Sequence, residues 1–134
     1  MPSEKEVMSG IKSCLEKWEY RKTVEYWERL NSGKIQVGYR WVQLAKKGSP
    51  DFICILRNKA KNLSLLFIEA KSDVGQLRLE QKQFRDKFTG LKDIGYFVIR
   101  DSQELDTIIR DIGWDKSQEE IDAIQWPGNK EEIH

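Results

Sequence analysis

The sequence holds a single histidine, and it is the last residue, His134. Serine–histidine triads, cysteine–histidine proteases and histidine-based nucleases all need a histidine inside the domain, as a base or as a ligand. The lack of an internal histidine therefore excludes these classes. Any hydrolytic chemistry in this chain has to rely on carboxylates and lysines, and we expect it to need a metal ion.

Cysteine and long apolar runs are also scarce. Cys14 and Cys54 are the two cysteines, and no CxxC pair occurs, so a zinc site is not expected. The two thiols are interpreted as small buried apolar residues in a reducing compartment. No run of 18 apolar residues is present, so no membrane span is expected. Residues 1–9 lack the apolar stretch of a secretory signal, which predicts a cytoplasmic protein.

The formal net charge is only +1, but charge is unevenly distributed along the chain. Residues 31–62 carry seven Lys/Arg and one acid, net +6, whereas residues 101–134 carry ten acids and three bases, net −7. The basic segment is a candidate DNA-phosphate surface; the alternative is a solvated loop region with uneven charge. Its basic residues are Lys34, Arg40, Lys46, Lys47, Arg57, Lys59 and Lys61.

With 134 residues, 39% of them hydrophobic and 34% charged, the chain has the size and composition of one soluble globular domain. Ser3 and Glu6 have capping-box spacing and predict a helix over residues 4–20. Periodicity and turn signals then predict strands at 23–30, 35–41, 52–56, 63–70 and 95–99, and helices at 78–91 and 102–112. This α-β-β-β-β-α-β-α order predicts an α/β fold, a mixed sheet flanked by helices.

Two apolar runs, 52–56 (FICIL) and 63–70 (LSLLFIEA), are separated by a short polar stretch. They predict an antiparallel pair buried at the centre of the sheet. Such a pair sets the start of the first strand beside the end of the second, which brings Asp51 next to Glu69. Residues two apart on a strand share a face, so Lys71 is expected to project with Glu69.

These three residues suit phosphodiester hydrolysis. The carboxylates of Asp51 and Glu69 are hard oxygen ligands for Mg²⁺ or Mn²⁺, and the backbone carbonyl of Ala70 offers a further ligand. Lys71 can orient the attacking water or stabilise the developing charge. The alternative is an ordinary pair of charged strand ends in a highly charged chain. The apolar runs beside both carboxylates favour the site, because buried carboxylates are costly unless paired or ligated.

Two further polar residues are candidates for the same site. Glu4 shares a helical face with Met8 and Ile11 and is a possible additional metal ligand; the alternative is favourable charge at a helix N-terminus. Gln81 lies on the apolar side of its helix and is a candidate to bind the attacking water or a phosphate. The alternative for Gln81 is an ordinary boundary glutamine.

The order and spacing of these motifs resemble the VRR-NUC family of the PD-(D/E)xK nuclease superfamily over roughly residues 4–100. The matching elements are the turn at 31–33, Gly48-Ser49-Pro50-Asp51, Glu69-Ala70-Lys71, Gly75, Gln81 and Glu4. The resemblance implies a restriction-endonuclease-like nuclease core over 1–100. The acidic segment after Asp101 is not part of the family pattern, and the helix and acidic tail over 101–134 are expected to pack on or extend the same domain. Ser72-Asp73 departs from the family pattern, in which basic residues are expected.

The resemblance also implies a divalent metal and a homodimer, of phage or bacterial origin, that cleaves branched DNA such as Holliday junctions. The leading hypothesis is therefore a structure-selective DNA endonuclease. The alternatives are a non-catalytic nucleic-acid-binding module on the same fold and a phage accessory interaction protein that uses the acidic tail. Trp27, Tyr39 and Trp41 are candidates for a dimer interface; otherwise they belong to the core.

Overall fold

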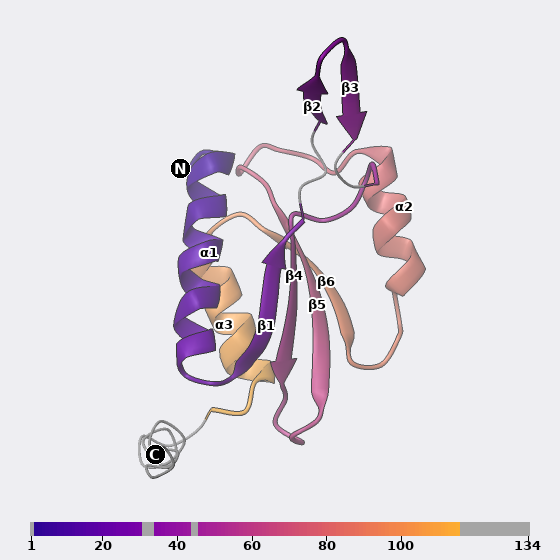
Figure 1. Ribbon diagram of the computed structural model, residues 1–134. Helices are drawn as coiled ribbons and strands as arrows, with labels where there is room; N and C mark the ends of the chain where they lie inside the picture. The colour runs from indigo at the N-terminus through magenta and orange to yellow at the C-terminus, as the bar shows by residue number, and fades with distance from the viewer. Residues whose placement is uncertain (1, 31–33, 44–45, 116–134) are drawn as a thin grey trace, which may run out of the picture.

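The computed structural model describes residues 2–30, 34–43 and 46–115, without the side chains of residues 34, 35, 42 and 43. Within these residues three helices and six strands follow one another, in the arrangement that Figure 1 shows. In chain order they are α1 (Glu4–Tyr20), β1 (Val24–Arg29), β2 (Lys34–Val37), β3 (Arg40–Gln43), β4 (Phe52–Arg57), β5 (Leu63–Ala70), α2 (Leu79–Phe88), β6 (Ile94–Ile99) and α3 (Ser102–Ile112).

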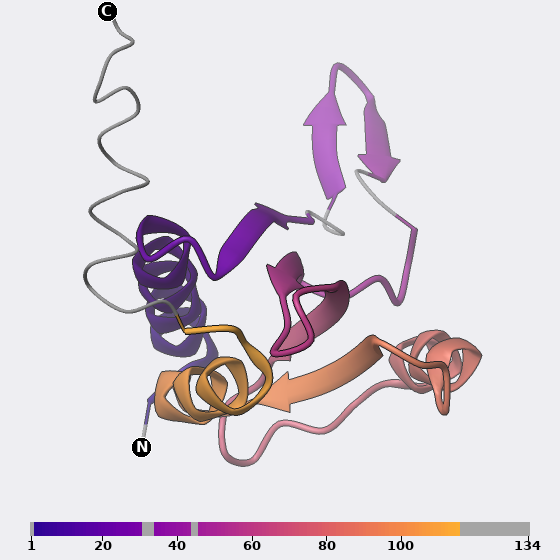
Figure 2. The same ribbon diagram turned by 90° about the horizontal axis from the view of Figure 1, so that it is seen from below.

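The main sheet has four strands in the order β1-β4-β5-β6. β4 pairs antiparallel with both β1 and β5, whereas β6 pairs parallel with β5 after the crossover through α2. Helices α1 and α3 lie together on one face and α2 lies on the other, as Figure 2 shows end-on. The expected mixed α/β sheet, with an antiparallel pair at its centre, is confirmed.

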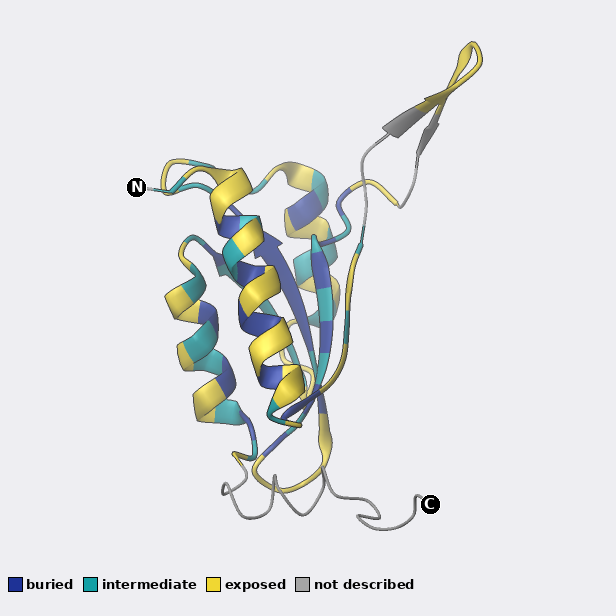
Figure 3. Cartoon of the chain, turned by 60° about the vertical axis from the view of Figure 1, so that its left-hand side comes forward, coloured by how far each residue is buried: buried dark blue, intermediate teal, exposed yellow. Residues whose placement is uncertain are grey.

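The apolar core lies between the sheet and the α1–α3 layer. The capping box predicted from Ser3 and Glu6 is confirmed, since each side chain accepts a hydrogen bond from the other residue's backbone N–H. From α1 the core takes Val7, Ile11, Cys14, Leu15 and Trp18, all buried on one stripe. Both cysteines are free and buried, as predicted. Figure 3 shows the buried stripe of α1 turned towards the sheet.

Helix α3 has the predicted bounds, 102–112, and the residue before it caps its N-terminus. Asp101 is the N-cap residue, and its carboxylate accepts a hydrogen bond from the backbone N–H of Gln103. The Glu104 side chain accepts a hydrogen bond from the backbone N–H of Asp101, which completes a capping box. Asp101 is therefore the helix cap, because its carboxylate can accept hydrogen bonds from the free N–H groups of the first turn.

The prediction of one strand over 35–41 in the main sheet is wrong. This stretch forms a separate two-stranded hairpin, β2–β3, in which Val37 pairs with Arg40 across a two-residue turn. Gly38 supplies the positive φ of +63° that such a turn requires at its first central position. Val37, Tyr39 and Trp41 are consequently exposed rather than in the core, on a hairpin that projects from the body (Figures 1 and 3).

Helix α2 is shorter than the predicted 78–91, and an aromatic cluster holds it on the sheet. The ring centroid of Phe67 on β5 lies 5.0 Å from that of Phe84 and 4.8 Å from that of Phe88. Phe84 also lies 6.1 Å from Tyr96 of β6. This packing holds the second half of α2 on the sheet, and the first turn of the helix then lies beside the carboxyl end of β5, close to Glu69.

The described helices include none that is long and apolar enough to cross a membrane. Of the predicted segment over 101–134, the helical part is α3, which packs against α1. The rest of that segment, from residue 116, lies outside the described residues, as does the predicted turn at 31–33.

The loop that leads into Asp51 is held against the start of α2. Gly48 has φ of +91°, and a Cβ atom there would lie 2.5 Å from the backbone oxygen of Glu80. The neighbouring Lys47 ammonium lies 3.3 Å from the Glu80 carboxylate. The loop therefore approaches α2 so closely that only glycine fits.

We predict that Gly48→Ala destabilises the fold by at least about 2 kcal/mol more than Gly90→Ala. Gly90 is the matched control, because its φ is also positive, at +81°, but no atom lies within 4 Å of the place that a Cβ atom would take. Gly90→Ala thus reports left-handed backbone strain alone, about 1 kcal/mol. Urea unfolding of both variants measures the difference; equal losses would contradict the contact with α2.

Candidate active site

The β4–β5 pairing brings Asp51 and Glu69 together. Phe52 pairs with Ile68, and the backbone N–H of Asp51 donates to the Ile68 carbonyl at 3.0 Å, which extends the register by one residue. Asp51 thus lies opposite Glu69 on the α2 face of the sheet. The Asp51 Oδ2 atom accepts a hydrogen bond of 2.8 Å from the backbone N–H of Ala70, which fixes its position at the sheet edge.

Glu69 is a deeply buried carboxylate with only 3% of its surface exposed. Its Oε2 atom accepts a hydrogen bond of 2.9 Å from Gln81 Nε2 and lies 4.0 Å from the ammonium of Lys71, which is itself buried. Its Oε1 atom is buried and has no hydrogen-bond partner among the described residues. A buried carboxylate oxygen without a protein partner is costly, and such an oxygen fits a role in cation binding.

Charge around Glu69 is unbalanced. Burial, more than any other cause, raises the pKa of Glu69 to about 9, and the nearby carboxylate of Asp51 adds to the shift. Lys71 lowers the pKa only in part, and Glu4 raises it further. Ionisation of Glu69 would place two carboxylates beside one ammonium, and a bound cation would compensate the second negative charge.

Gln81 is oriented so that its amide nitrogen faces Glu69. It is the N3 residue of α2, is 3% exposed, and its Oε1 atom accepts a hydrogen bond of 2.8 Å from the backbone N–H of Arg78. That bond leaves the Nε2 group as the donor to Glu69. The predicted position of Gln81 beside the carboxylates is confirmed, and its observed partner is Glu69 itself.

The oxygen donors at this edge fit a hard divalent cation. Asp51 and Glu69 supply carboxylate oxygens, of which Glu69 Oε1 is unpartnered. Because the N–H of Ala70 donates to Asp51, strand geometry directs the carbonyl of Ala70 to the same side of β5. This is the donor set that Mg²⁺ and Mn²⁺ prefer.

Glu4 is less closely associated with the pair. It is exposed at the start of α1, and its charge acts on Glu69, but the three carboxylates do not form a compact group. No cluster of three or more His, Cys, Asp or Glu side chains with metal-binding geometry occurs within the described residues. Glu4 therefore lies at the rim of the candidate site rather than beside Asp51 and Glu69.

Two residues near the site were not anticipated from the sequence. The Tyr96 hydroxyl on β6 is buried and lacks a hydrogen-bond partner among the described residues. Burial raises the pKa of Tyr96, and the charges of Glu69 and Asp51 raise it further. Arg100 donates through Nη1 to the carbonyls of Ser72, at 2.5 Å, and Gly75, at 2.7 Å. It thereby holds the loop that follows Lys71.

The basic segment does not form one surface. Lys46 and Lys47 are exposed in the loop before Asp51, and Arg40 is exposed on the β2–β3 hairpin. Lys34 begins β2, and its side chain lies outside the described residues.

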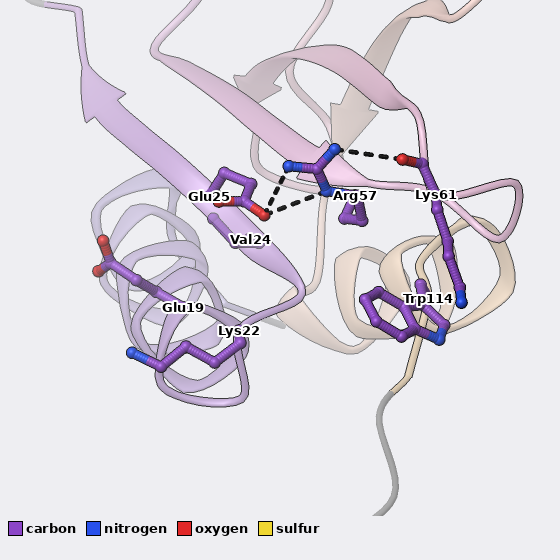
Figure 4. Close-up of a pocket in the computed structure, with 7 residues that line it drawn as sticks. All are labelled: Glu19, Lys22, Val24, Glu25, Arg57, Lys61 and Trp114. Atoms are coloured by element: carbon purple, nitrogen blue, oxygen red, sulfur yellow. Dashed lines mark hydrogen bonds and ion pairs between the residues drawn. The ribbon is translucent and has the colours of Figure 1, made fainter. Parts of the chain in front are cut away.

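The remaining basic residues, Arg57, Lys59 and Lys61, lie at the opposite end of β4 from Asp51. Figure 4 shows the cavity of about 610 Å³ that Arg57 and Lys61 line there. Arg57 pairs with Glu25 at 3.2 Å, and the Lys61 ammonium lies 4.8 Å from the centre of the Trp114 ring. Arg57 and Lys61 therefore interact with neighbours at this end of β4, away from Asp51 and Glu69.

The chain matches no protein-family model, no curated protein and no solved structure. The assignment of function therefore rests on the residues and the geometry of the site.

We predict that the metal-free protein loses stability as pH rises from about 5 towards 9. In that window the folded state keeps the Glu69 proton, whereas the unfolded chain, with a carboxyl pKa near 4.5, has released it. Glu69→Gln should abolish this dependence, which we expect to exceed about 1 kcal/mol between pH 5 and pH 8.

The measurement is the free energy of unfolding at several pH values in the presence of a chelator. Glu16→Gln, at an exposed position of α1, is the matched control and should keep the wild-type slope. A wild-type slope in Glu69→Gln would show that another group carries the dependence.

Proposed function

We propose that this protein is a metal-dependent, structure-selective DNA endonuclease of the VRR-NUC type with a restriction-endonuclease-like fold. The observation that carries the proposal is the buried carboxyl of Glu69 beside half-buried Asp51 and buried Lys71, with Glu69 Oε1 unpartnered among the described residues. An ordinary pair of strand ends would be solvated or fully paired, because burying uncompensated charge is costly.

In this proposal Asp51, Glu69 and the Ala70 carbonyl hold Mg²⁺ or Mn²⁺. A divalent cation bound there supplies charge neutralisation at the phosphate and a nucleophilic water. Gln81 keeps the Glu69 carboxylate oriented through its hydrogen bond of 2.9 Å. The Lys71 ammonium stabilises the negative charge that develops on the phosphate during hydrolysis.

The substrate class is argued from the surroundings of the site. Lys46 and Lys47 precede Asp51, and the hairpin with Arg40 is inserted between β1 and β4, whose ends meet at the carboxylate edge. These cations suit a phosphate backbone that crosses the edge. Branched DNA, such as a Holliday junction, is the substrate that the VRR-NUC resemblance implies.

A homodimer is part of the same proposal. Val37, Tyr39 and Trp41 are exposed on the projecting hairpin, and exposed aromatic side chains are common at interfaces. Symmetric cutting of a junction needs two active sites, which two copies of this chain would supply.

We predict cleavage of labelled DNA in the presence of Mg²⁺ or Mn²⁺. Four-way junction, flap, single-stranded and linear duplex substrates are compared on one gel. Lys71→Met, Asp51→Asn and Glu69→Gln should each reduce the rate by about 100-fold or more, since each removes a group that acts on the transition state or holds the metal. Lys92→Met, at an exposed position outside the site, is the matched control and should cut like wild type.

Binding without cutting, in every substrate and with either metal, would overturn the enzyme and favour the non-catalytic nucleic-acid-binding module. Equal cutting by wild type and Lys71→Met would place the active site elsewhere.

We also predict that millimolar Mn²⁺ raises the melting temperature of the wild type. A cation that binds only the folded site stabilises the fold by mass action, and it relieves the repulsion between Asp51 and Glu69. Asp51→Asn should lose most of the increase, whereas Asp111→Asn on the exposed side of α3 should retain it. The same increase in Asp51→Asn would argue against cation binding at this pair.

A further inference from the structure

A second concave surface lies on the other side of the sheet edge from the carboxylates. It is a groove of about 710 Å³ between the first half of α1 and the ends of β1 and β4. The helix and β1 lie side by side, and Figure 3 shows α1 beside the edge of the sheet. The groove is lined by Glu4, Lys5, Met8, Ser9, Lys12, Trp27, Arg29 and Phe52.

The floor of the groove is apolar and aromatic. Phe52 is buried, Met8 and Trp27 are partly buried, and the Trp27 and Phe52 rings lie 6.2 Å apart between centroids. The Trp27 indole N–H donates to the Glu19 carboxylate at 3.1 Å, which orients the ring. A partly exposed, oriented indole is a surface on which a planar group can stack.

The rim of the groove is basic. Lys5 and Lys12 are two helical turns apart on α1, and Arg29 ends β1 on the facing side. All three are exposed, and none forms an ion pair with another described residue. Glu4 is the one acidic residue among the described residues that line the groove. The rim therefore carries uncompensated positive charge on both sides of an aromatic floor.

The groove adjoins the end of β4 that carries Asp51, on the opposite face of the sheet. Arg29 pairs with Phe52 in the β1–β4 register, and the backbone N–H of Leu30 donates to the Asp51 carbonyl at 2.7 Å. Glu4 lines the groove, and its charge also acts on Glu69. The two sites therefore meet at the sheet edge formed by the end of β1 and the start of β4.

We propose that this groove binds an unpaired arm of DNA, with a base stacked on Trp27 and phosphates against Lys5, Lys12 and Arg29. A duplex keeps its bases stacked inside and uses only the cations, whereas an unpaired strand uses both the cations and the apolar floor. The proposal rests on the DNA endonuclease function, because it takes the adjoining site to act on DNA. It assigns selectivity for branched over linear DNA to α1 and β1.

The test measures binding in a chelator, so that no DNA is cut. Fluorescence anisotropy compares a blunt duplex with the same duplex carrying a single-stranded arm. Wild type should bind the armed duplex about tenfold more tightly. Lys5→Glu combined with Lys12→Glu should remove this preference. Lys87→Glu combined with Lys92→Glu, which changes the net charge equally at exposed positions outside the groove, should retain it.

Trp27→Leu tests the stacking surface and keeps an apolar side chain on Phe52. It should weaken binding of the armed duplex by about fivefold or more and leave the blunt duplex unaffected. Salt titration adds a second readout for the variant that combines Lys5→Glu with Lys12→Glu. Loss of two phosphate contacts to the single strand should make the plot of log affinity against log salt concentration less steep by about 1.4.

The proposal is overturned if wild type does not prefer the armed duplex, or if the groove variant keeps the preference. It is also overturned if the groove and control pairs lower both affinities equally, which would indicate general electrostatics. Cutting of the armed duplex, the blunt duplex and a four-way junction in Mn²⁺ is measured separately. A groove variant that no longer prefers the arm but still cuts one of these substrates supports the groove and the endonuclease independently. A wild type that prefers the arm but cuts none of the three removes the nuclease alone.

Discussion

The register between β4 and β5 is the constraint on which the site depends. Side chains on a strand alternate between faces, so a slip of one residue would turn Glu69 and Lys71 towards the α1–α3 core and the core residues Ile68 and Ala70 outwards. Apolar packing against α1 therefore specifies the position of the polar residues on the opposite face. The candidate site is thus held in place by residues of the apolar core, chiefly Phe52, Cys54, Leu66 and Ile68.

The face that α2 covers combines two kinds of packing. At one end Phe67, Phe84 and Phe88 form an aromatic cluster, and at the other Gln81 reaches the buried carboxylate of Glu69. The cluster positions the helix, and the helix positions the amide. The buried carboxyl of Glu69 is thus supported by neighbours that contribute stability.

The sequence predicted the central pair and the positions of Asp51, Glu69, Lys71 and Gln81, because alternation and long apolar runs are strong local signals. The turn at Gly38 was missed because Val37 and Tyr39 continue the alternation across it. Tyr96 and Arg100 reach the site only through the parallel pairing of β6 with β5, which no local pattern encodes. Arg57 was grouped with Lys47 by sequence distance, but an extended strand of six residues carries the chain about 20 Å away.

Arg100 gives the site a dependence on the order of assembly. It follows the last strand, holds the loop after Lys71 through two carbonyls, and its own N–H bonds Glu104 in the capping box of α3. The backbone N–H of Lys71 likewise donates to Ile99. Parallel pairing closes a long loop and forms slowly compared with a hairpin. A folding chain would therefore gain Asp51 and Glu69 as neighbours early, in the β4–β5 hairpin, but acquire a rigid Lys71 only when β6 docks and α3 begins.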